Sequence, residues 1–512
     1  MARRGSLREV ELVEDDEPDA PRTPDDPHAT TPDARAARRR RRRWVVAGAA
    51  LAAVALVVAV VGQRVVDAGV RARIAAVADQ QGAVRPLAGP PSVLWEAGEQ
   101  DLYGMLDART ADGDLVGVRH SADGPVAVAA LDRATGAELW RTELVDGTTR
   151  GASPGVDGQV HPWSGRCVAY PAREHAVVCL AHDGWSVYDD EGGTEVPPSQ
   201  VRVVLLDTRD GSVVRDLGDA LGVVSTRVPS TVTVVGDLVV ASDLPGDGQA
   251  HVRAATVDGA PAWDVAFPVG DEREGAFVTP LRDAGTTTVA VVTGDEVRLL
   301  DATGAEVGTF DIGDRYVTTL GTDQLALVEQ YERDVGGLVR DGDTGLTVVR
   351  ADGTTVQVRG DLAYASVDDG SVPGLVLTHE RGRLTAWDDD GTELWTSEEL
   401  VDGRDVMVLD GRVHVESGVR LLALDARTGA ELWRSEAGSD LTATDGRHLL
   451  VVSVGARRGE GRQLVAVDPA DGSEAWRTPL PDGVDEVMPV LGLLVAIEHT
   501  DDGVGQEYTV LG

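Results

Sequence analysis

The chain has 512 residues and a net charge of −39, and only its first 43 residues are near neutral, with 11 Arg and 10 acidic residues. The rest holds 76 acidic and 36 basic residues, and so acidic a surface repels phosphate backbones, which excludes nucleic-acid binding as the role of this part. Abundant Gly with few aromatic residues indicates an all-β domain of short strands joined by tight turns.

Residues 1–43 form the first predicted segment. They are rich in Asp, Glu, Pro, Thr and Arg and end in an uninterrupted basic run from Arg38 to Arg43. A segment with so few apolar side chains cannot offset the entropy lost on ordering. We therefore predict a disordered tail.

Residues 44–62 form an apolar stretch without a charge. A helix of this length spans roughly 28 Å, close to the hydrocarbon core of a bilayer. The Arg run before it predicts a single-pass membrane protein with a cytoplasmic N-terminus and an extracytoplasmic main domain. A cleaved signal peptide is the alternative, but the long charged region and the missing cleavage site favour a retained transmembrane helix. Residues 63–91 are then predicted to be a partly helical stalk or linker.

One pattern recurs between residues 92 and 512. It reads Leu-Asp-x-x-Thr-Gly-x-x-x-Trp from Leu131 to Trp140 and again from Leu424 to Trp433. The apolar run before each Asp predicts a strand, the Asp and Gly a turn, and the residues up to the Trp a second strand. Further copies, some weak and one degenerate, include Asp207, Asp258, Asp301, Gly353, Asp388 and Asp468.

The spacing of the copies predicts a β-propeller. From Asp207 to Asp468 the mean interval is near 44 residues, the length of a four-stranded blade. The domain begins with a Trp strand at Trp95 that has nothing before it, and it ends with a strand at 506–511 that has no Trp strand after it. Pairing these two strands would close a ring and leave no exposed sheet edge there.

The repeated element resembles that of the PQQ-repeat (quinoprotein-like) β-propeller proteins, which include the propeller lipoprotein of the outer-membrane assembly machinery. The resemblance covers residues 92–512 and favours eight blades, whereas the repeats with the composite blade number nine. We predict eight blades, with nine as the alternative. It also implies that six Trp residues dock between successive blades, namely Trp95, Trp140, Trp263, Trp395, Trp433 and Trp476.

The two cysteines, Cys167 and Cys179, flank a predicted strand pair with a Pro-containing turn. Opposite positions of paired strands suit disulfide geometry, so we predict a disulfide in an oxidising compartment. Two buried free thiols are the alternative.

The first long interval between repeats, residues 145–200, holds aromatic residues away from the docking positions. We predict partner contacts at Trp163, Trp185 and Tyr188, because Trp and Tyr anchor interfaces. The alternative is an acidic loop whose two Trp residues pack on their own blade. The acidic run 189–191 beside them lacks the spacing of a known Ca²⁺ loop, and no metal site is predicted.

No catalytic residue is predicted. The chain has no Gly-x-Ser-x-Gly motif, and its His residues are scattered singly among the blades. Cofactor-using relatives bind PQQ and Ca²⁺ through Asn and acidic ligands, often beside adjacent cysteines. This chain has no Asn and no adjacent cysteines, so those roles transfer to no position and no cofactor is expected.

The sequence therefore favours a membrane-anchored, extracytoplasmic binding or scaffold module for cell-envelope proteins, peptides or glycans. A PQQ-dependent oxidoreductase is the first alternative, and an envelope sensor that reports through the Arg-rich tail is the second.

Overall fold

The computed structural model divides the chain into residues 1–68 and 69–512. It describes residues 64 and 68–512 except 99–101, 103–104, 106, 121–124, 147–158, 163–164, 190–191, 224–230, 270–275, 284–285, 314, 321–323, 330–344, 439, 455–460 and 500–505. In that described part, no helix is long and apolar enough to cross a membrane. The predicted tail and membrane helix, 1–43 and 44–62, lie outside it.

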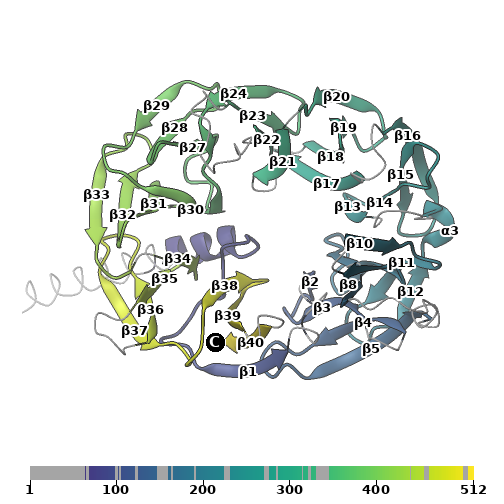
Figure 1. The fold of residues 1–512 in the computed structure, drawn as a ribbon, viewed down its shortest axis with the longest axis horizontal. Coiled ribbons are helices and arrows are strands. Elements are labelled where there is room, and N and C mark those ends of the chain that lie inside the picture. The colour runs from purple at the N-terminus through teal and green to yellow at the C-terminus, as the bar shows by residue number, and fades with distance from the viewer. Residues whose placement is uncertain are drawn as a thin grey trace, which may run out of the picture. The chain divides into compact units, whose positions relative to one another are not determined.

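Residues 69–512 form a ring of four-stranded antiparallel blades (Figure 1). Continuous apolar runs place buried residues on both faces of the middle strands, because each blade is covered by a neighbour on either side. Strand β36 (Arg462–Val467), for example, is buried from Leu464 to Val467. The described strands make nine such blades, so of the two predicted blade counts the structure has nine.

The first five blades follow one another in chain order. Blade 1 is β2 (Ala108–Arg109), β3 (Leu115–Arg119), β4 (Val126–Leu131) and β5 (Glu138–Val145). Blade 2 is β7 (Arg166–Ala169), β8 (Ala176–His182), β11 (Val201–Asp207) and β12 (Val213–Asp216), and a short helix, α3 (Gly218–Leu221), follows it. Blades 3 to 5 are β13 (Thr231–Val235), β14 (Leu238–Asp243), β15 (Gln249–Thr256) and β16 (Pro261–Pro268); β17 (Ala276–Asp283), β18 (Thr286–Thr293), β19 (Glu296–Leu300) and β20 (Glu306–Asp311); and β21 (Arg315–Leu320), β22 (Gln324–Glu329), β23 (Gly345–Arg350) and β24 (Thr355–Arg359).

The remaining blades include one extra strand. Blade 6 is β25 (Asp361–Leu362), β27 (Val376–Glu380), β28 (Arg383–Trp387) and β29 (Glu393–Thr396). Blade 7 is β30 (Asp402–Leu409), β31 (Arg412–Ser417), β32 (Arg420–Asp425) and β33 (Glu431–Ser435), with β26 (Ala365–Asp368) parallel to β30 at its edge. Blade 8 is β34 (Asp440–Thr444), β35 (Leu449–Val454), β36 and β37 (Glu474–Pro479), and blade 9 is β38 (Glu486–Val490), β39 (Leu493–His499), β40 (Gln506–Leu511) and β1 (Val93–Gly98).

Blade 9 closes the ring as the sequence predicts. Its first three strands come from the C-terminal part of the chain, and its fourth strand is β1. The two pair in antiparallel register from Val93 opposite Leu511 to Gly98 opposite Glu507. Ser92 and Gly512 extend the pair, since each backbone N–H donates to the other's carbonyl at 3.0 Å.

The repeated Asp and Gly shape the turn between the third and fourth strands of a blade. In blade 7, the Asp425 carboxylate accepts the backbone N–H groups of Arg427 at 3.1 Å and Thr428 at 2.9 Å. Gly429 completes the turn with φ +69°, a conformation that side chains with a Cβ rarely adopt. The sequence therefore fixes this turn locally, before any blade packs on another.

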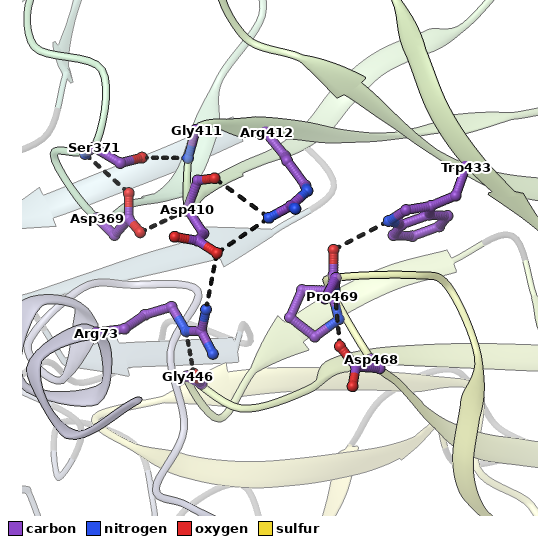
Figure 2. Close-up of polar contacts among 11 residues, drawn as sticks. Arg73, Asp369, Ser371, Asp410, Gly411, Arg412, Trp433, Gly446, Asp468 and Pro469 are labelled. Atoms are coloured by element: carbon purple, nitrogen blue, oxygen red, sulfur yellow. Dashed lines mark hydrogen bonds and ion pairs between the residues drawn. The ribbon is translucent and has the colours of Figure 1, made fainter. Parts of the chain in front are cut away.

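Five of the six docking Trp residues lie against the turn of the following blade. The Trp433 ring packs on Gly472, and its Nε1–H donates to the Pro469 carbonyl at 3.0 Å (Figure 2). The same donation to the corresponding turn carbonyl occurs at Trp95, Trp140, Trp263 and Trp395, to Arg133, Thr208, Ala302 and Ala426. Trp476 differs, because its buried Nε1 has no hydrogen-bond partner.

Three blades lack a Trp at the docking position. The strand register places Arg215, Gly308 and Val356 there in blades 2, 4 and 5. Val356 still contacts the turn of blade 6, because a Cβ on Gly391 would lie 3.0 Å from its Cγ1. The contact between a fourth strand and the next turn is therefore retained there with a smaller side chain.

The Trp–Gly contact predicts a specific stability effect. A Cβ on Gly472 would lie 2.5 Å from the Trp433 ring, whereas a Cβ on Gly418 would meet nothing within 4 Å, and both glycines have positive φ. Both Gly472→Ala and Gly418→Ala place a Cβ on a backbone with positive φ, but only Gly472→Ala also displaces a docked ring. Gly472→Ala should therefore lower the free energy of unfolding by about 2 kcal/mol more than Gly418→Ala. Denaturant unfolding of the two variants measures this, and equal losses would contradict the docking contact.

Candidate functional site

A tenth sheet stands apart from the nine blades. Strands β6 (Gln159–Pro162), β9 (Trp185–Asp189) and β10 (Gly192–Val196) form it in the order β10-β9-β6. β6 lies in the connection from blade 1 to blade 2, and β9 and β10 lie in the connection between the second and third strands of blade 2. We call it the accessory sheet.

The blade topology places this sheet on one face of the ring. In an antiparallel meander the first-to-second and third-to-fourth connections share one end of the strands, here called the turn face. The second-to-third and blade-to-blade connections share the other end, the loop face. The third-to-fourth turns have six residues at most, whereas the connections 183–200 and 330–344 on the loop face are far longer. The accessory sheet therefore belongs to the loop face.

A buried carboxylate closes the base of the accessory hairpin. Asp183 is 2% exposed and accepts the Ser199 backbone N–H at 2.7 Å, the Ser199 hydroxyl at 2.6 Å and the Gln200 N–H at 2.9 Å. A carboxylate is costly to bury unless donors surround it, so this arrangement holds the two ends of the connection together. The hairpin of β9 and β10 thus emerges from a fixed base.

A disulfide lies in the same blade. Cys167 on β7 and Cys179 on β8 stand directly opposite each other and are bonded, and both are buried. The Asp107 carboxylate accepts the Cys167 backbone N–H at 3.3 Å. Burial raises the pKa of Asp107 to about 6, although this hydrogen bond and the charge of Arg166 act in the opposite direction.

The three predicted contact residues have different outcomes. Trp163 lies outside the described residues, and Tyr188 lies in β9, which the structure describes only as a strand. Trp185 begins the same strand but is 4% exposed, so the expectation that it offers a surface contact is corrected.

Sequence reasoning did not identify the accessory sheet or the role of Asp183. Three short strands from two separate connections leave no periodic pattern, and the Ser199 partner is 16 residues away. The length of the interval 145–200 was the only signal, and it indicated an insertion without indicating its structure.

The described residues offer no evident cofactor or metal centre. They include no group of three His, Cys, Asp or Glu side chains placed to hold a metal ion. The cysteines are paired across two strands rather than adjacent, and the chain has no Asn. The residues present therefore do not fit the known PQQ and Ca²⁺ ligand pattern, and none is assigned to that cofactor.

Comparison with known protein families identifies a match in the part of the chain that holds the clearest repeats. The family model described as outer membrane protein assembly factor BamB matches residues 293–437 and 417–510. The resemblance to PQQ-repeat propellers is confirmed. The matched residues run from blade 4 to blade 9, where the Asp–Gly–Trp repeats are densest. No curated protein matches the chain.

Solved structures similar to the chain include BamB from Moraxella catarrhalis, with 16% identity over 82% of this chain and 99% of that one, at a TM-score of 0.36. Quinohemoprotein alcohol dehydrogenase from Comamonas testosteroni has 14% identity over 84% of this chain and 78% of that one, at a TM-score of 0.37. Likenesses at this level say nothing about function.

The half-buried Asp107 carboxyl predicts a dependence of stability on pH. Its folded-state pKa of about 6 exceeds the unfolded value of about 3.9, so the folded state keeps a proton that the unfolded state releases between these values. Stability therefore falls as pH rises through this window, and Asp107→Asn should remove that loss. We expect the thermal midpoint of Asp107→Asn minus that of wild type to increase between pH 4 and pH 7. The same difference for Asp112→Asn, at an exposed position, should not change with pH. A difference in thermal midpoint between Asp107→Asn and wild type that stays constant at all pH values would contradict the raised pKa of Asp107.

Proposed function

We propose that this chain is a membrane-anchored, extracytoplasmic propeller that binds a protein, peptide or glycan of the cell envelope and holds it near the membrane. The observation that carries the proposal is the accessory sheet, which extends the loop face of an otherwise regular ring. Connections that exceed what the fold needs are where binding residues concentrate in rigid scaffolds.

The loop face supplies a fixed platform for such binding. Each blade is held by its neighbours through docked side chains, and the disulfide and the Asp183 clamp hold the blade from which the accessory hairpin emerges. A preorganised surface loses little entropy when a partner binds. The high negative charge also favours partners with basic or neutral surfaces and speeds their approach at low salt.

The family match supports an envelope role without naming a partner. The matching family model is described as an outer membrane protein assembly factor, and it covers less than half of this chain. The apolar stretch at 44–62 supports anchoring, and the Arg run before it supports an extracytoplasmic propeller.

The test compares the predicted contact residue Trp163 with an exposed apolar residue on the loop face, Val419. We expect Trp163→Ala to weaken capture of the envelope partner at least tenfold, since a central aromatic anchor typically contributes 2 kcal/mol or more. Val419→Ala is the control, because Val419 is 76% exposed in a loop-face connection of blade 7. Full-length wild type and both variants are incubated with envelope extract, and the captured proteins and glycans are quantified by mass spectrometry.

Equal capture by all three proteins would contradict the placement of the binding surface. Reduction of a dye by purified wild type after incubation with PQQ and Ca²⁺ would instead establish the oxidoreductase alternative.

A further inference from the structure

Residues 69–87, here called the strap, lie along the turn face of the propeller. They begin with a helical segment, residues 69–77. This segment contacts blades 7 and 8 through Arg73. Arg73 donates from Nε to the Gly446 carbonyl at 2.8 Å, and its guanidinium lies 3.6 Å from the Asp410 carboxylate (Figure 2). Asp410 and Gly446 belong to the first-to-second turns of those two blades.

The middle of the strap is buried against blade 7 and its extra strand β26. Val77 is 1% exposed and packs in a cluster with Val367, Met407 and Leu441, among others. The Gln80 side chain accepts the Asp368 backbone N–H at 2.6 Å and donates to the Asp368 carbonyl. These contacts satisfy the inner edge of β26, which would otherwise leave backbone groups unpaired.

The last part of the strap crosses from blade 8 to blades 9 and 1. Val84 donates its backbone N–H to the Thr444 carbonyl at 2.8 Å, and Arg85 donates its N–H to the Gly492 carbonyl at 3.0 Å. The Arg85 guanidinium also donates to the Gly113 carbonyl at 3.1 Å. Thr444, Gly492 and Gly113 lie in or beside the first-to-second turns of blades 8, 9 and 1. The strap thus joins four successive blades.

A second observation comes from the interface between blades 8 and 9. Every other docking Trp donates its indole N–H to a third-to-fourth turn, but Trp476 Nε1 has no partner. The cause is topological, because the third and fourth strands of blade 9 are β40 and β1, which no turn joins. This interface therefore lacks the polar half of the docking contact.

The strap crosses that same interface with contacts of its own. In addition to the Val84 and Arg85 bonds, the Leu87 N–H donates to the Asp445 carboxylate at 3.0 Å. Asp445 is fully buried and also accepts the backbone N–H groups of Arg447 at 2.8 Å and His448 at 2.6 Å. A single buried carboxylate thus ties the strap to the turn of blade 8.

We propose that the strap stabilises the closed ring. It holds together the interface between blades 8 and 9, where Trp docking is incomplete. Closure of the ring therefore depends on the segment that precedes β1. Release of the strap loosens blades 8, 9 and 1 before the rest of the propeller. The segment that leads toward residues 44–62 is then a structural part of the ring, and tension on it reaches the closure directly.

Two glycines of this region provide a matched test. A Cβ on Gly82 would lie 2.7 Å from both Ser366 Oγ and Val367 Cγ2, whereas a Cβ on Gly89 would meet nothing within 4 Å. Gly82→Ala should therefore displace the strap, and Gly89→Ala should not. Hydrogen exchange of the full-length protein, followed by mass spectrometry, reports on each blade separately.

For Gly82→Ala we expect at least tenfold faster exchange in β1, β37, β38 and β40, and unchanged exchange in β13–β24; Gly89→Ala should match wild type throughout. Faster exchange confined to residues 69–87, or spread evenly over all blades, would overturn the proposal.

A second pair of variants tests the incomplete interface independently. Trp433→Phe removes an indole hydrogen bond, whereas Trp476→Phe removes none. Trp433→Phe should therefore lower the ratio of folded to unfolded protein roughly fivefold more than Trp476→Phe does. Equal losses would show that Trp476 has an acceptor in solution and would overturn the premise.

Discussion

The packing of a Trp side chain on the Gly turn of the next blade is the contact on which this structure depends. A four-stranded blade cannot bury both of its faces alone, so it is stable only between two neighbours. The Trp433 ring and the Pro469 carbonyl show how one side chain joins an apolar contact to a directional hydrogen bond. The Gly of the turn is required for two reasons. It adopts a positive φ, and a Cβ at its position would occupy the space of the Trp ring.

This constraint separates the two faces of the ring. The third-to-fourth turns that receive the docked side chains must keep their length and their Gly, so these turns vary little. The strap contacts the other set of turns on this face, the first-to-second turns of four successive blades. Among the described residues, the docking contacts lie on the turn face, and the accessory sheet is built on the loop face. A binding role assigned to the loop face therefore leaves the packing of the ring undisturbed.

The repeated motif predicted much of this, because each copy encodes a local turn and a docking residue in adjacent positions. It predicted the blades, the composite blade 9 and the pairing of the Trp95 strand with the end of the chain. The blade count stayed open between eight and nine because the family resemblance favoured eight, whereas the repeats with the composite blade numbered nine. The strap and the Asp183 clamp could not be predicted, since their partners are distant in sequence and follow no period.

The central claim is that the propeller binds an envelope partner through its loop face. A photo-crosslinking amino acid placed at Tyr188, in the accessory sheet, or at exposed Arg427, in a turn-face connection of blade 7, tests it in intact cells. The account predicts that the residue at 188 crosslinks to a discrete envelope component and that the residue at 427 does not. Crosslinks from position 427 alone, or from neither position, would contradict it.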